Sequence, residues 1–352
     1  MKTATRNALG RLRINGAILR SLAVAATAVF ATAAGAAQAP AAGATAAGAN
    51  PDDLLVVVNR EDATVTLFNS RGAFLNLIQT LPTGKGPREA AVTPDGKRAY
   101  VSNKDDGTLT VIDLAGPSVA ATVQDPALKD PEGLTVSPDG KKLYVALSSR
   151  DVIAVLSTAD HRVLKEISTG GKQPMRLIMA PDGKTLYVSN DQSRSVAIIE
   201  TKNDALATTL NVGQQPRGLA LSPDGSLLAV VNTGWDTVTF IDTKKRALEE
   251  TIGVGYAPQR IVFSPDSQFA YVTGRGHGEI LVLGLRNGSR RYARSIEIGT
   301  QPNGLAISKD GTALFVGDDK DNMMYVIDVR LMRKWTQKPA GKYPDGVTLF
   351  TR

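Results

Sequence analysis

The sequence contains no cysteine and only two histidines, His161 and His277, among its 352 residues. Without cysteine the protein cannot form disulfides, thiolate metal sites, a cysteine nucleophile or a lipidated N-terminal cysteine. Two histidines are too few for a histidine-rich metal centre. The sequence also lacks a G-x-S-x-G nucleophile motif, a Walker-type phosphate loop and an EF-hand calcium loop. The residues therefore predict no metal site and leave catalytic residues and cofactors unassigned.

Acidic residues are missing from the first 39 positions, and this explains most of the formal charge of +7. That segment carries five basic residues: Lys2, Arg6, Arg11, Arg13 and Arg20. Without them the chain has 41 − 5 = 36 basic and 34 acidic residues, a net charge of +2. A nearly neutral remainder has little general attraction for nucleic acid, which we do not expect as a partner.

The N-terminus has the pattern of a secretory signal peptide. A basic part up to Arg20 is followed by an uncharged Ala-rich stretch with candidate A-x-A sites at Ala34–Ala36 and Ala37–Ala39. We predict a cleaved signal peptide at 1–36, a flexible Ala/Gly spacer at 37–51, and a periplasmic protein with no membrane span after cleavage. A retained membrane anchor or a mitochondrial presequence are the alternatives.

A proline-centred phrase recurs seven times after the spacer. Its intervals are 44, 43, 42, 42, 44 and 42 residues, and six of the seven copies have Gly three residues before the Pro. The prolines are Pro87, Pro131, Pro174, Pro216, Pro258, Pro302 and Pro344. A constant period of this length indicates a repeat architecture rather than a two-layer sandwich.

Each repeat has the residues of four short strands. The proline phrase is followed by a turn such as SPDG, in which Pro presets the first dihedral angle and Gly accepts a positive φ. Strands such as TLYVSN and TVTFIDT come next, and a fourth strand completes the unit. Four strands in each of about seven units predict an all-β fold, a seven-bladed β-propeller with four antiparallel strands per blade.

The two ends of the chain hold complementary parts of one repeat. Residues 54–59, LLVVVN, occupy the place of a second strand, and the C-terminal PDGVTLF has only a first strand. Together they complete one blade, so the N- and C-termini share it and no sheet edge stays open between the first and last blades.

The tetrapeptides YVSN at Tyr100 and Tyr187 and YVTG at Tyr271, with the PDG turn and the closing VID, resemble the YVTN β-propeller repeat family over residues 52–352. This family is similar to a broader seven-bladed set with sugar lactonases, quinoprotein amine dehydrogenase subunits and a nitrite reductase haem domain. Many YVTN members are exported bacterial proteins. Because these relatives perform unrelated chemistry, the resemblance implies the fold and not a reaction.

The loops before the first strands carry four arginines close after the proline: Arg88, Arg176, Arg217 and Arg260. The family resemblance implies that these loops open on the ligand-binding face, so we expect the arginines to converge at the channel mouth. A guanidinium fork suits carboxylate or phosphate, which predicts an anion-binding funnel. The alternative is that the arginines form ion pairs between blades with Glu89, Glu132 or Asp345.

Two further residues are candidates for ligand contact. Trp235, in the loop TGWDT, can stack on a ligand or pack against a neighbouring loop. His277, in the Gly-rich loop GRGHG, can act as an acid or base or remain solvated. His161 is expected on the opposite face, so the two histidines cannot form a pair.

These observations favour a monomeric binding or scaffold module that recognises an anionic small molecule or a periplasmic protein at the channel mouth. The family resemblance leaves two alternatives. One is a metal-dependent, lactonase-like hydrolase, and the other is an accessory subunit of a periplasmic quinone or haem redox system.

We expect the mature protein to begin between about residues 37 and 49, because cleavage follows an A-x-A site. N-terminal sequencing of the native protein measures this directly. Finding Met1 or Lys2 at the N-terminus would contradict export with cleavage.

Overall fold

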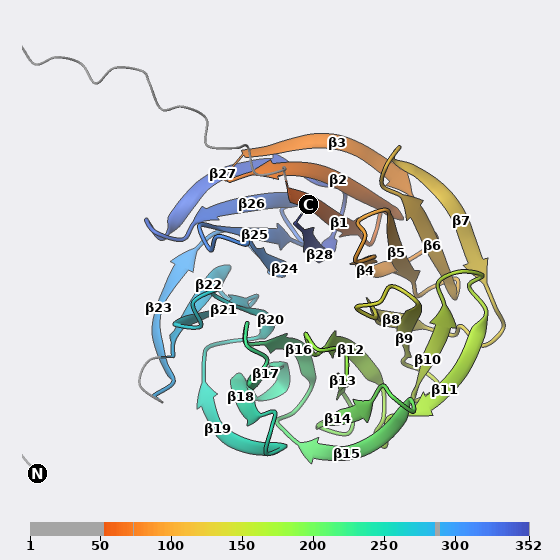
Figure 1. Cartoon of the computed structure of the whole chain (residues 1–352). Helices are drawn as coiled ribbons and strands as arrows, with labels where there is room; N and C mark the ends of the chain where they lie inside the picture. The colour runs from red at the N-terminus through yellow and green to blue at the C-terminus, as the bar shows by residue number, and fades with distance from the viewer. Residues whose placement is uncertain (1–52, 73, 286–288, 352) are drawn as a thin grey trace, which may run out of the picture. The chain divides into compact units, whose positions relative to one another are not determined.

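The computed structural model describes residues 53–72, 74–285 and 289–351. These residues form seven four-stranded antiparallel sheets arranged as the blades of a ring (Figure 1). The predicted seven-bladed β-propeller is confirmed. The predicted signal peptide at 1–36 and spacer at 37–51 lie outside the described residues.

Every blade has one innermost strand beside the channel and one outermost strand at the rim (Figure 1). From the channel outward the sheets are β28 (Pro344–Phe350), β1 (Asp53–Asn59), β2 (Thr64–Arg71), β3 (Phe74–Pro82); β4 (Pro87–Val92), β5 (Arg98–Asn103), β6 (Thr108–Asp113), β7 (Ser118–Gln124); β8 (Pro131–Val136), β9 (Lys142–Leu147), β10 (Val152–Ser157), β11 (Val163–Ser168); β12 (Pro174–Met179), β13 (Thr185–Asn190), β14 (Ser195–Glu200), β15 (Ala205–Asn211); β16 (Pro216–Leu221), β17 (Leu227–Asn232), β18 (Thr237–Asp242), β19 (Ala247–Gly253); β20 (Pro258–Phe263), β21 (Phe269–Gly274), β22 (Glu279–Gly284), β23 (Arg291–Glu297); β24 (Pro302–Ile307), β25 (Ala313–Asp318), β26 (Met323–Asp328), β27 (Arg333–Pro339).

The closing blade combines both ends of the described chain. Strand β28 pairs antiparallel with β1, and Val347 lies opposite Val57 and Leu349 opposite Leu55. The predicted shared blade is therefore confirmed. Because β28 also contacts the innermost strands β4 and β24, it completes the ring through the sheet and through both neighbouring blades.

The middle strands are apolar on nearly every residue because both faces of a blade are covered. Tyr100, Val101 and Ala99 of β5 are fully buried, although their side chains alternate between the two faces of the sheet. Tyr100 packs in a cluster with residues of β8, β9 and β10, while Ala99 and Val101 pack with residues of β1 and β2. Each blade is thus held by apolar contact with the blades on either side.

In four blades the Gly three residues before the proline lies against a buried asparagine. Asn232, the last residue of β17, donates through Nδ2 to Thr237 Oγ1 at 3.0 Å and to Thr239 Oγ1 at 2.9 Å. Its Oδ1 accepts the N–H of Gly213 at 3.0 Å. A Cβ atom at Gly213 would lie 2.6 Å from Asn232, so only glycine permits this approach.

In the one repeat without this glycine, both the glycine and the asparagine are replaced by leucine. Leu128 stands at the glycine position before Pro131, and Leu147 stands at the position of the buried asparagine. Of the other six blades, four have asparagine at this place, one has Gly274 and one has Asp318. Leu128 and Leu147 are buried in the same apolar cluster. A polar junction has been exchanged for an apolar one, which leaves no buried amide without partners.

The turn between the first two strands forms as its residues predict. Ser222 Oγ donates to Asp224 Oδ1 at 2.6 Å, and the same oxygen accepts the N–H of Ser226 at 3.1 Å. Gly225 has φ +71°. Side-chain hydrogen bonds and the positive φ together reverse the chain direction.

We expect deletion of residues 345–352 to destabilise the protein strongly. The deletion removes most of β28 and exposes the paired edge of β1 to solvent. The melting temperature should fall by at least about 10 °C, with aggregation on heating. Differential scanning calorimetry measures the effect.

Deletion of residues 41–48, an Ala/Gly-rich segment of the same length, serves as the control and should be nearly silent. Equal melting temperatures for the tail deletion and the intact protein would contradict closure through β28.

Candidate functional site

The second residue after each loop proline lies on an innermost strand, and large charged residues alternate there with glycine. Around the ring the seven residues are Gly346, Glu89, Gly133, Arg176, Gly218, Arg260 and Gly304. A Cβ atom at Gly133 would lie 2.5 Å from the carbonyl oxygen of Met175, and one at Gly218 would lie 2.5 Å from that of Gln259. The glycines therefore allow adjacent inner strands to approach, and the three charged side chains enter a channel that no other large side chain at this level fills.

The three charged residues have their backbone held in the same way. The N–H groups of Glu89, Arg176 and Arg260 donate to Ser102 Oγ at 3.3 Å, Ser189 Oγ at 3.2 Å and Thr273 Oγ1 at 2.9 Å. In the four blades with glycine the equivalent residues carry no hydroxyl: Val58, Ala146, Val231 and Gly317. The YVSN and YVTG tetrapeptides thus mark the blades whose inner strands carry charge.

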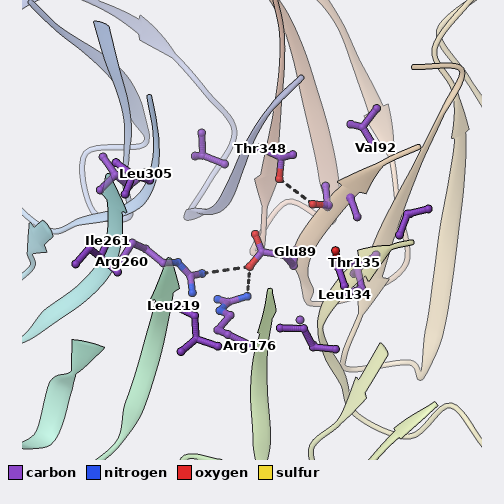
Figure 2. A pocket seen from close by; sticks show the side chains of 17 residues that line it. Glu89, Val92, Leu134, Thr135, Arg176, Leu219, Arg260, Ile261, Leu305 and Thr348 are labelled. Atoms are coloured by element: carbon purple, nitrogen blue, oxygen red, sulfur yellow. Dashed lines mark hydrogen bonds and ion pairs between the residues drawn. The ribbon is translucent and has the colours of Figure 1, made fainter. Parts of the chain in front are cut away.

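Three arginines and two carboxylates from four blades meet beside the channel, and we call Arg88, Glu89, Arg176, Arg260 and Asp345 the arginine cluster. Glu89 lies between Arg176 and Arg260 (Figure 2). Its Oε2 forms an ion pair with Arg176 and lies 3.7 Å from Arg260 Nη2. The side chains of the three arginines are between 11% and 15% exposed, so water screens these ion pairs weakly.

Asp345, on the closing strand β28, contacts all three arginines. Its carboxylate oxygens lie 3.6 Å from Arg88 Nη1, 3.5 Å from Arg176 Nη2 and 3.0 Å from Arg260 Nη2. Asn303 Nδ2 donates to the same carboxylate at 3.1 Å. Since β12 and β28 are separated by two blades on one side and three on the other, the contact with Arg176 crosses the channel.

The arginine cluster contains one more positive than negative group. Glu132 lies nearby, 3.9 Å from Arg88 Nε, but its carboxylate is already paired with Lys104. Burial raises the pKa of Glu89 to about 7, with Arg176 opposing the shift and Asp345 and Glu132 adding to it. Near neutral pH the cluster therefore has an excess of at least one positive charge.

A cavity of about 350 Å³ lies in the channel beside the cluster (Figure 2). Glu89, Arg176 and Arg260 line one end, and the inner strands continue from there along mostly aliphatic side chains to Val92, Val136 and Thr348. A cavity that combines aliphatic side chains with a few charged groups at one end is suited to a small molecule.

Asn303 links Asp345 to a second group of polar side chains, Asp319, Arg275 and Tyr343. The buried carboxylate of Asp319 is 3.3 Å from Arg275 Nη2 and accepts a hydrogen bond from Asn303 Nδ2 at 3.2 Å. Arg275 Nη2 also donates to Tyr343 OH at 2.8 Å. Burial raises the pKa of Asp319 to about 8, and the negative charge of Asp345 adds to the shift.

The structure separates the other predicted site residues from the cluster. Arg217 pairs with Asp191, with Nε to Oδ2 at 3.0 Å, and it does not line the cavity. Trp235 ends a short 3-10 helix, η1 (Thr233–Trp235), rather than lying in an irregular loop, and its exposed ring faces the guanidinium of Arg194 at 5.8 Å. The third, His277, is also exposed and lies 3.6 Å from Glu279 through Nδ1.

From the sequence, Glu89, Glu132 and Asp345 were expected only as alternative partners of the arginines. Asn303, Arg275 and Asp319 were not predicted as site residues. Asn303 occupies the position after its proline that Asp345 occupies after Pro344. This equivalence in the repeat could have marked Asn303 as a neighbour of the site. The contacts themselves join residues from different repeats, which periodicity does not pair.

Within residues 53–72, 74–285 and 289–351, no group of three or more His, Asp or Glu side chains is placed to hold a metal ion. In the same part of the chain, no helix is long and apolar enough to span a membrane. The cluster is built from ion pairs instead.

A family model described as a YNCE-like β-propeller matches residues 12–150 and 205–351, more than half of the chain. The chain belongs to the YNCE-like β-propeller family. A second model, described as a seven-bladed β-propeller lactonase, matches residues 121–210 of this YNCE-like propeller. Among curated proteins, no relative matches it.

Solved structures with the same fold include hydrazine synthase from Kuenenia stuttgartiensis, 21% identical over 76% of this chain and 96% of that one, with a TM-score of 0.68. A putative 6-phosphogluconolactonase from Bacteroides fragilis is 18% identical over 85% and 98%, with a TM-score of 0.73. Another from Bacteroides uniformis is 16% identical over 85% and 100%, with a TM-score of 0.74. At these identities the likeness shows the fold alone.

We expect the Asp319→Asn variant to change how stability depends on pH. The folded pKa of about 8 lies above the ordinary value of 3.8, so the folded protein keeps a proton that the unfolded chain releases between these values. Relative to the variant, the unfolding free energy of the parent should fall by up to about 1.4 kcal/mol per pH unit between about pH 4 and pH 8. Urea unfolding at several pH values measures this.

Asp139→Asn is the matched control. Hydrogen bonds from Ser137 Oγ and from the N–H of Lys141 lower the pKa of Asp139, so its contribution has the opposite sign and is lost as pH falls through the folded pKa. Parallel stability curves for the parent and Asp319→Asn from pH 4 to pH 8 would contradict the raised pKa.

Proposed function

We propose that the protein is a ligand-binding propeller that holds a small anion at the arginine end of its central channel. The observation that carries the proposal is the placement of Arg176 and Arg260 together at one end of the cavity. A guanidinium fork matches the oxygens of a carboxylate or phosphate. Three arginines and Lys104 face the carboxylates of Glu89, Asp345 and Glu132, so one positive charge is in excess and a bound anion completes the charge balance.

We further propose that it is a YVTN-type propeller that acts in the periplasm as a monomer. The basic and then Ala-rich N-terminal sequence supports export. The small net charge of the remaining chain gives little attraction for nucleic acid. An acidic segment of a periplasmic protein has the same charge as the small anion and is the second kind of partner that the cluster suits.

A lactonase-like hydrolase is the second candidate function. It is favoured by the lactonase model at residues 121–210 and by the two neighbours described as putative 6-phosphogluconolactonases. The arginine cluster suits the phosphate of such a substrate, whereas a metal-dependent mechanism would need ligands beyond the carboxylates already paired with arginine. Hydrolysis of 6-phosphogluconolactone by the purified protein, followed as acid release, tests it. An accessory role in a redox system has only the likeness to hydrazine synthase in its favour.

We expect the double variant Arg176→Gln with Arg260→Gln to lose anion binding, since it removes both guanidinium groups that line the cavity. Isothermal titration with acetate, hexanoate, inorganic phosphate and 6-phosphogluconate at pH 7 measures the loss. The parent should bind at least one of these anions, more weakly at high salt, and the double variant should bind it at least tenfold more weakly.

Arg217→Gln is the matched control because Arg217 pairs with Asp191 away from the cavity. Circular dichroism checks that each variant is folded. Binding by the double variant that equals that of the parent, or a parent that binds none of the four anions, would contradict the proposal.

A further inference from the structure

Next to the charged residues, the wall of the cavity is formed by aliphatic side chains in six of the seven blades. The residue three positions after the loop proline is branched and apolar in each of them: Leu134, Leu177, Leu219, Ile261, Leu305 and Val347. The remaining blade has Ala90, which leaves more space on the side of Glu89. A ligand held at the arginines therefore lies with its other end against a ring of aliphatic side chains.

Beyond the charged end the cavity offers few polar side chains. Among its lining residues, all of which belong to the described part of the chain, only Thr135 and Thr348 carry a side-chain hydroxyl, and none is aromatic. Thr348 Oγ1 already donates to the carbonyl oxygen of Ala90 at 2.7 Å. A sugar in this space would find two side-chain hydroxyl groups, one of them already engaged, and no aromatic ring to stack on.

The charge of the cluster limits the charge of its ligand. Arg88, Arg176 and Arg260 carry three positive charges, and Glu89 and Asp345 carry two negative ones. A buried charge without a partner is unfavourable, so one added negative charge stabilises the cluster. A dianion would overcompensate this excess while the carboxylates of Glu89 and Asp345 are ionised.

We infer that the channel binds a small monocarboxylate with an apolar body, with its carboxylate at Arg176 and Arg260 and its hydrocarbon part along the aliphatic ring. This inference rests on the proposed anion-binding function and names the chemical class of the ligand. The volume of about 350 Å³ is at the small end for ligand pockets, so the hydrocarbon part is short.

The test compares acetate, butyrate, hexanoate, hexylamine and 6-phosphogluconate by isothermal titration with the full mature protein. Each added methylene group should strengthen carboxylate binding about fourfold, as expected for its burial against aliphatic side chains. Hexylamine should bind at least tenfold more weakly than hexanoate because the cluster is positive. The sugar phosphate should also bind at least tenfold more weakly than hexanoate.

The outcomes separate this inference from the proposed function. Acetate and hexanoate that bind within twofold of each other, or 6-phosphogluconate that binds more tightly than hexanoate, would overturn the inference. Loss of that binding in the Arg176→Gln, Arg260→Gln variant would still support the proposed function. Failure of every anion to bind would overturn both.

A wall variant tests the position of the hydrocarbon part. Leu219→Gln replaces a partly buried aliphatic side chain with one that carries an amide. It should reduce the gain in affinity from acetate to hexanoate at least fivefold, whereas Leu206→Gln on the exposed face of β15 should leave that gain as in the parent. If Leu219→Gln does not fold, Leu177→Gln provides the same test, and an unchanged gain in the folded variant would overturn the inference.

Discussion

The candidate site depends on the ion pairs of Asp345, and Asp345 belongs to the strand that closes the ring. Asp345 lies on the last strand, β28, whose pairing with β1 closes the propeller. The same carboxylate contacts Arg88, Arg176 and Arg260, which come from three other blades. Closure of the ring and assembly of the arginine cluster are therefore not separate events, because the strand that completes the last blade also brings the shared negative charge to the channel.

The sequence makes room for this cluster by alternating glycine with charge around the channel. Gly133, Gly218 and Gly346 allow their strands to approach neighbouring backbones, and hydroxyls on the second strands fix the backbone of the charged residues. With only three large side chains at this level, space remains beyond them, and aliphatic residues cover its wall. The cavity with its charged end and aliphatic side chains thus follows from packing between blades together with the choice of residue at one repeated position.

Most of the fold could be predicted from the sequence, because the proline phrase, the turn and the strand pattern are local and recur at a nearly constant interval. The shared blade also followed, since the two ends hold complementary parts of one repeat.

The site was predicted less completely. Arg176 and Arg260 stand two positions after their prolines and line the cavity, whereas Arg217 stands one position after its proline and pairs with Asp191 instead. Arg88 also stands one position after its proline, yet it pairs with Asp345 in the cluster without lining the cavity. Position in the phrase alone therefore does not decide which contacts an arginine makes. Contacts across the channel, such as that of Arg176 with Asp345, join repeats far apart in sequence and have no local signal.

A double-mutant cycle between Asp345 and Arg260 tests the central claim most directly. The unfolding free energies of the parent, Asp345→Asn, Arg260→Gln and the double variant give the coupling energy of the pair, whose closest atoms are 3.0 Å apart. If Asp345 holds the cluster together, the coupling should be about 1–3 kcal/mol, and a parallel cycle between Asp345 and Arg217 should give less than about 0.5 kcal/mol. A coupling near zero for Asp345 and Arg260 would contradict the account.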